Sequence, residues 1–228
     1  MIRALVSWSG GKDSAWTLEL LRRRSDVEVA GLFTTVHRES AKVAVHGVPL
    51  ALLEAQARAA GLPVRELDIP ANCPNPVYER AVGELVAQAK AEGVTHLAFG
   101  DLFLEDIRRY RERQFAASGV ELLFPLWGAD TGRLARDMTG RGLRAWITCV
   151  DTEQAPAAWA GCLFDKRFVD EVPAGIDPCG ENGEFHTFVV EGPMLRGRVD
   201  ARVAGVRREG RWAYADLEKG SEQFSCNT

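Results

Sequence analysis

The chain has 228 residues, which suits one larger domain, or one domain with a small appendage, and allows an extensive hydrophobic core. Lysine and arginine number 28 against 32 aspartate and glutamate residues, so the formal net charge of −4 provides no general attraction to nucleic acid or to an anionic membrane. No apolar run approaches the length that spans a membrane, and the first residues lead directly into a strand-like segment, so we expect a cytoplasmic protein.

Short apolar, β-branched runs alternate with helix-like stretches through the first two-thirds of the chain. The stretches between the runs are rich in Ala, Leu, Glu and Arg. This alternation predicts an α/β fold with a mostly parallel, Rossmann-like sheet and helices on both of its faces. The expected strands cover residues 4–7, 27–36, 64–69, 95–100 and 121–126.

The stretch SWSGGKDSAW, residues 7–16, joins the first expected strand to the first expected helix. A glycine-rich turn at a helix N-terminus exposes backbone N–H groups at the positive end of the helix dipole, where phosphate binds. Its glycines allow close backbone approach, its lysine adds a cation and its serines supply hydroxyl donors. The candidate phosphate-binding residues are Ser9, Gly10, Gly11, Lys12, Asp13 and Ser14.

Asp13 is an unusual member of a phosphate site. A carboxylate beside phosphates is favourable when a divalent cation lies between them, so Asp13 is a candidate metal ligand. The turn matches neither G-x-x-x-x-G-K-[ST] nor G-x-G-x-x-G. The alternative is a tight turn in which Asp13 or Ser14 only caps the helix. Trp8, within the turn, is expected to pack in the core.

The pattern changes in the last third of the chain. A further apolar run covers residues 144–150, residues 161–186 are loop-like, and residues 198–217 alternate apolar and polar side chains. The alternation predicts an antiparallel hairpin with its turn at Gly210. We therefore expect a smaller C-terminal α+β region and two domains, at residues 1–128 and 129–228.

The chain has five cysteines, which are scattered along the sequence. They form no C-x-x-C pair and no Cys/His set at the spacing of a zinc site, so we expect reduced thiols. They are Cys73, Cys149, Cys162, Cys179 and Cys226.

A second unusual stretch, DPCGENGEFHTFV, begins at Asp177. Its proline and glycines prevent a regular helix, so Glu181, Asn182 and Glu184 are expected on a turn that leads into a strand. Two carboxylates and an amide this close together can bind a cation, orient ammonia or hold a polar substrate group, or they can form an ordinary turn. His186 follows as an acid–base candidate or an ordinary, partly buried histidine.

The two motifs together resemble known families. SGGKDS resembles the SGG-x-D-S loop of the PP-loop ATP pyrophosphatases, which cleave ATP between its α- and β-phosphates. With GENGEFHT, and with FGDLFLEDIRRYRE at residues 99–112 and PLWG at residues 125–128, the chain resembles the diphthine–ammonia ligase branch of that superfamily. The resemblance implies an adenine-nucleotide α-hydrolase (HUP-type) fold, with residues 1–128 as the ATP-binding domain and residues 129–228 as a family-specific substrate domain.

The resemblance also implies a reaction and its cofactors, ATP and Mg²⁺. A substrate carboxylate attacks the α-phosphate of ATP, pyrophosphate leaves, and ammonia then displaces AMP. The phosphate turn would hold the pyrophosphate end, with Lys12 and Asp13 as catalytic residues and Asp13 near the metal. Glu181, Asn182 and Glu184 would form the catalytic end that receives the substrate or ammonia.

Further residues are carried over from the resemblance. Gly100 and Asp101 end an expected strand at the carboxyl edge of the sheet, where ligands of such folds bind. Asp101 is therefore expected to face the nucleotide or metal, or else to cap a helix over residues 102–110. His46, on the connection after the second strand, and His186 are candidate substrate-binding residues, together with Glu181 and Glu184; a solvated loop histidine is the alternative for His46.

The acceptor of the ammonia stays open. It is diphthine on translation elongation factor 2 if the source organism makes diphthamide, or else another carboxylate such as a bacterial small-molecule acid. A PP-loop enzyme acting on tRNA is a second interpretation, although the acidic net charge and the absence of paired cysteines argue against it. A non-catalytic module that binds adenine nucleotide is a third. Free ammonium is the simplest nitrogen donor, and a homodimer is compatible with the sequence.

Overall fold

The computed structural model describes residues 1–37, 42–43, 48–70 and 73–220 of the chain. The candidate substrate-binding residue His46 and the fifth cysteine, Cys226, lie outside the described residues. The other four cysteines are free thiols. Within the described ranges, no helix is both long enough and apolar enough to cross a membrane.

The N-terminal half forms a six-stranded sheet whose long strands are all parallel, in the order β4-β2-β1-β5-β6. The short strand β3 pairs antiparallel with the end of β2. This arrangement confirms the Rossmann-like α/β fold expected from the alternating pattern. The strands are β1 (Ile2–Ser7), β2 (Val27–His37), β3 (Lys42–Val43), β4 (Val64–Ile69), β5 (His96–Ala98) and β6 (Glu121–Leu123).

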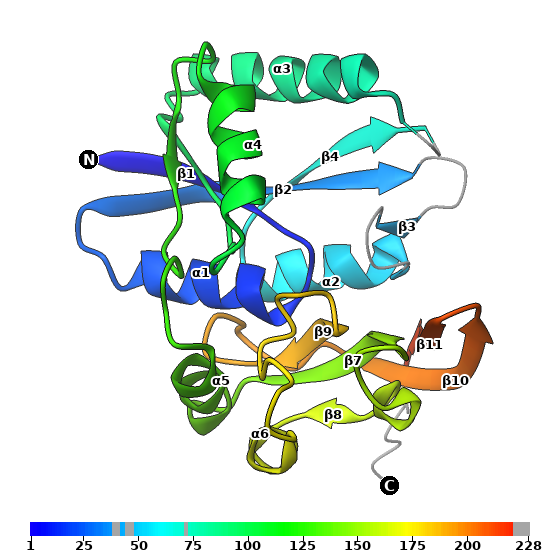
Figure 1. Cartoon of the computed structure of the whole chain (residues 1–228). Coiled ribbons are helices and arrows are strands. Elements are labelled where there is room, and N and C mark those ends of the chain that lie inside the picture. The colour runs from blue at the N-terminus through cyan, green and yellow to red at the C-terminus, as the bar shows by residue number, and fades with distance from the viewer. Residues whose placement is uncertain (38–41, 44–47, 71–72, 221–228) are drawn as a thin grey trace, which may run out of the picture.

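Helices cover both faces of this sheet (Figure 1). The helices α1 (Lys12–Arg22) and α2 (Leu50–Ala60) lie on one face, and α3 (Asn75–Ala91) and α4 (Glu105–Phe115) lie on the other. The middle of β1 is apolar on both sides of the strand and completely buried, as expected for the centre of a doubly covered parallel sheet.

The C-terminal half forms a five-stranded antiparallel sheet in the order β10-β11-β7-β8, with β9 paired to the other edge of β7. Gly210 has a φ of 57° and lies at the turn between β10 and β11, which confirms the expected hairpin. The elements of this half are α5 (Thr131–Gly140), β7 (Arg144–Asp151), a 3₁₀ turn (Ala157–Trp159), β8 (Leu163–Phe164), α6 (Lys166–Glu171), β9 (Phe185–Glu191), β10 (Ala201–Glu209) and β11 (Trp212–Lys219).

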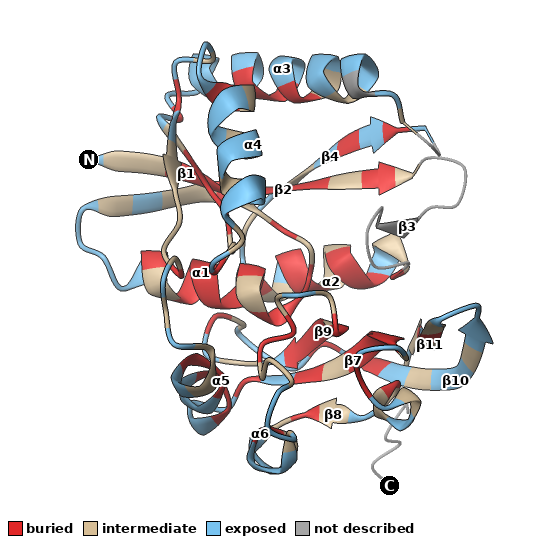
Figure 2. Cartoon of the chain, viewed as in Figure 1, coloured by how far each residue is buried: buried red, intermediate tan, exposed pale blue. Residues whose placement is uncertain are grey.

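The helices α1 and α2 form a layer between the two sheets (Figure 1). Figure 2 shows buried residues on these helices and on β7 and β9 below them. One hydrophobic cluster includes Val6 of β1, Leu18 of α1 and Ile147 of β7, so both sheets contribute to one core. The expected domain boundary at residue 128 stays a prediction.

The helix α4 begins later than expected. The sequence indicated a helix over residues 102–110 with Asp101 as one candidate cap, but the helix starts at Glu105 with Leu104 at the N-cap position. Leu102 is fully buried, and its N–H donates to the Glu181 carboxylate rather than joining a helical turn. The capping interpretation of Asp101 is therefore wrong.

The shared core predicts the effect of a cavity in the middle layer. Leu18 is 0% exposed, and we expect Leu18→Ala to lower the free energy of unfolding by about 2–5 kcal/mol, as for other large-to-small core changes. The control is Val206→Ala on the hairpin, where the side chain is 55% exposed and the change should be within about 0.5 kcal/mol. Urea denaturation of both variants measures the difference, and equal losses would contradict a core position for Leu18.

Candidate functional site

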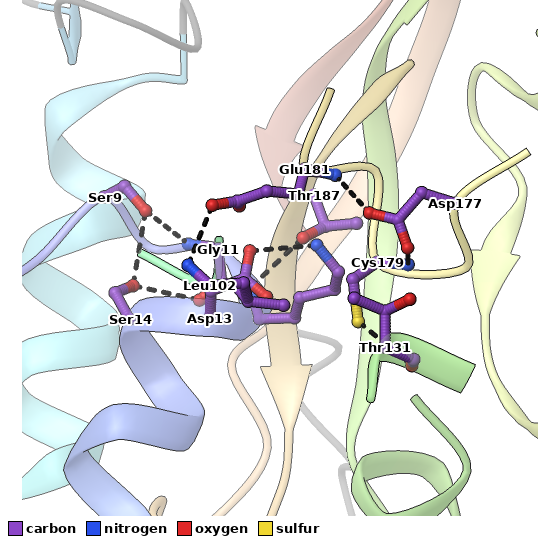
Figure 3. Close-up of polar contacts among 11 residues, drawn as sticks. Ser9, Gly11, Asp13, Ser14, Leu102, Thr131, Asp177, Cys179, Glu181 and Thr187 are labelled. Carbon is purple, nitrogen blue, oxygen red and sulfur yellow. Dashed lines mark hydrogen bonds and ion pairs between the residues drawn. The ribbon is translucent and has the colours of Figure 1, made fainter. Parts of the chain in front are cut away.

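The phosphate turn is closed by its own hydroxyl groups (Figure 3). Ser9 Oγ accepts a hydrogen bond from the Gly11 N–H at 3.2 Å and lies 3.3 Å from Ser14 Oγ. Ser14 Oγ in turn donates to the Gly11 carbonyl at 2.9 Å. These contacts hold the backbone in a compact loop directly before the first turn of α1.

Two glycines of the site have no room for a side chain. Gly10 has a φ of 79°, and a Cβ there would come within 2.8 Å of Gln56 Oε1. A Cβ on Gly100 would lie 2.9 Å from the backbone carbon of Asp13. Gly100 therefore lets the end of β5 approach the N-terminus of α1.

The strand β9 attaches directly to the phosphate turn. The Val189 N–H donates to the Gly10 carbonyl at 2.9 Å. Two residues earlier, Thr187 Oγ1 accepts from the Lys12 N–H at 3.1 Å. Gly11, the N-cap residue of α1, has no side chain, so a hydroxyl from the C-terminal half satisfies one of the free N–H groups of this helix.

Lys12 and Asp13 form a buried ion pair at the start of α1. Lys12 Nζ lies 2.9 Å from Asp13 Oδ2 and 5.4 Å above the ring of Phe185. Burial by itself disfavours the ammonium, but the carboxylates of Asp13 and Glu181 outweigh it and raise the pKa of Lys12 above its ordinary value. Burial also raises the pKa of Asp13, against the opposing effect of Lys12.

The second oxygen of Asp13 is suited to a cation. Asp13 Oδ1 is buried and has no hydrogen-bond partner among the described residues. In the part of the chain that the structure describes, no group of three or more His, Cys, Asp or Glu side chains could hold a metal. Mg²⁺ commonly binds one or two carboxylates and completes its shell with phosphate oxygens and water. Asp13 therefore fits a Mg²⁺ ion that arrives with a nucleotide.

The loop before β9 is built around two carboxylates. Asp177 accepts hydrogen bonds from the Cys179 and Glu181 N–H groups, at 3.1 and 2.8 Å. Glu184 Oε1 accepts from the Asp177 N–H at 3.2 Å and from Asn182 Nδ2 at 3.1 Å. Glu184 is 4% exposed, and its second oxygen, Oε2, is buried without a hydrogen-bond partner among the described residues. Glu184 and Asn182 thus shape the loop that carries Glu181.

Glu181 reaches from this loop to the N-terminal half of the chain. Its Oε1 accepts a hydrogen bond from the Leu102 N–H at 2.8 Å (Figure 3). Burial raises the pKa of Glu181 to about 7, and the Leu102 N–H and the positive charge of Lys12 only partly oppose this shift. A carboxyl group with this pKa exchanges a proton near neutral pH.

His186 is neutral at physiological pH. Burial and then the charge of Lys12 lower its pKa to about 4.

Both motifs line one small cavity of about 110 Å³. Its lining residues are Ser9, Gly11, Lys12, Asp13, Gly180, Glu181, Phe185, His186 and Thr187. A larger cavity of about 300 Å³ shares Ser9 with it, so the two adjoin at the phosphate turn. The larger one is lined by Ser7, Trp8, Ser9, Phe33, Thr34, Thr35, Leu67, Tyr78, Val82, Phe99, Arg111 and Phe115.

Asp101 lies beside the larger cavity but is engaged by Arg111. The Arg111 guanidinium donates to both Asp101 oxygens, at 2.6 and 3.0 Å, and lies 4.3 Å from the centre of the Phe99 ring. Asp101 therefore holds a cavity-lining cation in place.

The structure brings together six of the residues that the sequence singled out: Ser9, Gly11, Lys12, Asp13, Glu181 and His186. Of the others, Glu184 and Asn182 point into their own loop, and Gly10, Ser14 and Gly100 shape the turn. Sequence reasoning missed Thr187, although it lies inside the second motif. It also missed Gln56, a polar residue on the buried face of α2 whose position within the helical repeat was the available signal.

Comparison with known proteins agrees with this geometry. A family model described as the diphthamide synthase N-terminal domain matches residues 2–122, and one described as the diphthamide synthase C-terminal domain matches residues 130–223. The chain belongs to the diphthamide synthase family. Its first half is thus of the PP-loop ATP pyrophosphatase type, and the family uses ATP. No curated protein matches the chain at a significant level.

The raised pKa of Glu181 predicts a pH-dependent cost to stability. Its ordinary pKa is 4.5 and its pKa in the folded protein is about 7. Between these values the folded protein holds a proton that the unfolded chain has released, so stability falls as pH rises through this window. Glu181→Gln keeps the acceptor for Leu102 and removes the titration. We therefore expect the variant to have a higher Tm than the natural protein at pH 8, with the difference vanishing toward pH 4.5.

Thermal unfolding at several pH values measures this difference. The matched control is Glu84→Gln on the exposed face of α3, which leaves the cavity untouched. A variant less stable than the natural protein at pH 8 would mean that the Glu181 carboxylate stabilises the fold, contrary to the effect of burial.

Proposed function

We propose that this chain is an ATP-dependent ligase that forms AMP and pyrophosphate while it joins ammonia to a carboxylate. The observation that supports it most is the meeting of two motifs at one cavity: Lys12 and Asp13 from the phosphate turn, and Glu181 from the loop before β9. A module that only binds ATP has no need of a titratable carboxylate from a second motif.

The two adjoining cavities suit the two parts of ATP. The larger one, about 300 Å³, is within the size range of small-ligand sites and lies at the carboxyl ends of β1 and β2, where parallel sheets bind nucleotides. Its aromatic and threonine side chains would take the adenosine. The phosphates would then pass Ser9, which lines both cavities, and reach the N-terminus of α1.

In the first step, an oxygen of the acceptor carboxylate attacks the α-phosphorus of ATP. The bond to the bridging oxygen breaks, so an acyl-adenylate forms and pyrophosphate leaves with the electron pair. Lys12 and the positive end of the α1 dipole stabilise the negative charge on the leaving pyrophosphate, and they are already in place before the reaction. Asp13 would hold Mg²⁺ through Oδ1, and the charge of that ion would neutralise phosphate oxygens.

In the second step, ammonia attacks the carbonyl carbon of the acyl-adenylate, and AMP leaves with the electrons of the broken C–O bond. The nitrogen releases one proton to solvent as the amide forms. Ammonium must lose a proton before it can attack. Glu181, with a pKa of about 7, accepts this proton when it is ionised, above that pH. His186 is neutral and adds no positive charge that would repel ammonium. The membership in the diphthamide synthase family supports diphthine on translation elongation factor 2 as the acceptor.

The products formed from α-labelled ATP test the proposal. The protein is incubated with Mg²⁺ and ammonium, with and without an elongation factor 2 that bears diphthine. We expect labelled AMP only when ammonium and the factor are both present. ADP would contradict the mechanism, and ATP binding without AMP formation would direct the search to another carboxylate.

Lys12→Met tests the charge at the phosphate turn. The variant keeps a chain of similar length but loses the ammonium, so we expect AMP formation to fall by about 100-fold, the loss typical of removing a preorganised electrostatic group. Lys166→Met on α6 is the control, because the Lys166 side chain is 77% exposed and lies outside the cavity. Unchanged AMP formation by Lys12→Met would remove Lys12 from the mechanism.

A further inference from the structure

Gln56 is a fully buried polar side chain between the two sheets. It lies on α2, where its neighbours along the buried face of the helix are Leu52, Leu53 and Ala60. Its exposed fraction is 0%. A buried amide destabilises a protein unless its hydrogen-bonding groups find partners. The hydrogen bonds of the Gln56 side chain therefore indicate its structural role.

Those contacts join three segments that are far apart in the sequence. Gln56 Oε1 accepts from Trp8 Nε1 at 3.1 Å. Gln56 Nε2 donates to the Gly10 carbonyl at 2.9 Å and to the Val189 carbonyl at 2.5 Å. One carboxamide thus connects α2, the phosphate turn and β9, and it uses both of its donors.

The bond to Gly10 fixes the orientation of the peptide that follows it. The Gly10 carbonyl is held from the interior by two donors, Gln56 Nε2 and the Val189 N–H. In a planar trans peptide the C=O and the following N–H point in opposite directions. Holding the Gly10 carbonyl inward therefore turns the Gly11 N–H outward, toward Ser9 Oγ, to which it donates at 3.2 Å. Ser9 and Gly11 both line the small cavity.

We propose that Gln56 is a positioning residue for the phosphate turn, one that sets the orientation of the Gly10–Gly11 peptide and thereby the affinity of the site for the phosphate groups of ATP. This inference rests on the proposed function. Gln56 acts through Gly10 and contributes to phosphate binding without touching the nucleotide.

Gln56→Met tests the inference because methionine has a similar length and no amide. We expect the Kd for ATP and for pyrophosphate to rise at least tenfold, whereas the Kd for adenosine, which has no phosphate, changes less than twofold. Isothermal titration calorimetry on the full chain measures all three values. Gln88→Met is the matched control on the exposed face of α3 and should change none of them.

Gln56→Glu is the second variant and covers the case in which Gln56→Met does not fold. It keeps the acceptor for Trp8 Nε1 and the shape of the side chain, but replaces the amide donor with an oxygen that faces two carbonyls. The same selective loss of ATP and pyrophosphate affinity is expected, and circular dichroism at the assay temperature shows that the variant is folded.

The outcomes separate this inference from the proposed function. Equal losses for ATP and adenosine, or no loss for either, would overturn the role of Gln56 without contradicting the proposed function. If the natural protein itself bound neither ATP nor pyrophosphate, the proposed function would fail first and the inference with it.

Discussion

The attachment of β9 to the phosphate turn is the constraint on which the site depends. The turn ends in Gly11, which has no side chain to cap α1, so the first N–H of the helix is satisfied by Thr187 from the other sheet. The Gly10 carbonyl is held by the same strand through Val189. The N-terminal sheet places the turn at its carboxyl edge, but the antiparallel sheet completes its shape. This is a physical reason for the two halves to sit on a shared helical layer.

A single buried cation organises the electrostatics of the cavity. Lys12 pairs with Asp13 and lies over the ring of Phe185, and its charge also acts on Glu181 and His186. The net result is one carboxyl group that titrates near pH 7 beside a histidine that stays neutral. Burial produces both shifts, because it disfavours the charged form of either group. Such a site can bind an anion at the phosphate turn, while the nearby Glu181 carboxylate can still accept a proton.

The sequence was most informative about the phosphate turn, where the residues that shape the backbone are also the candidates for binding phosphate. The SGGKDS turn requires glycine for close approach and hydroxyl groups to close the loop, so both features are visible in a short stretch. It was least informative about the direction of each polar side chain in the second motif. Glu181 and Glu184 are equivalent by spacing and composition, yet one reaches Leu102 across the cavity and the other turns back to Asp177. A turn rich in glycine has many backbone paths, and the contacts with Leu102 and with the N-terminus of α1 select one.

The sequence by itself determined the alternation of strands and helices, the parallel sheet, the hairpin at Gly210 and the two motifs, because periodicity and turn chemistry are local properties. Only the tertiary structure decided that the two motifs share a cavity, that Asp101 is engaged by Arg111, and that Gln56 joins three segments. Gln56 and Gly10 are separated by 46 residues, and Gln56 and Val189 by 133. Contacts across such separations depend on how the layers pack, and no local pattern encodes them.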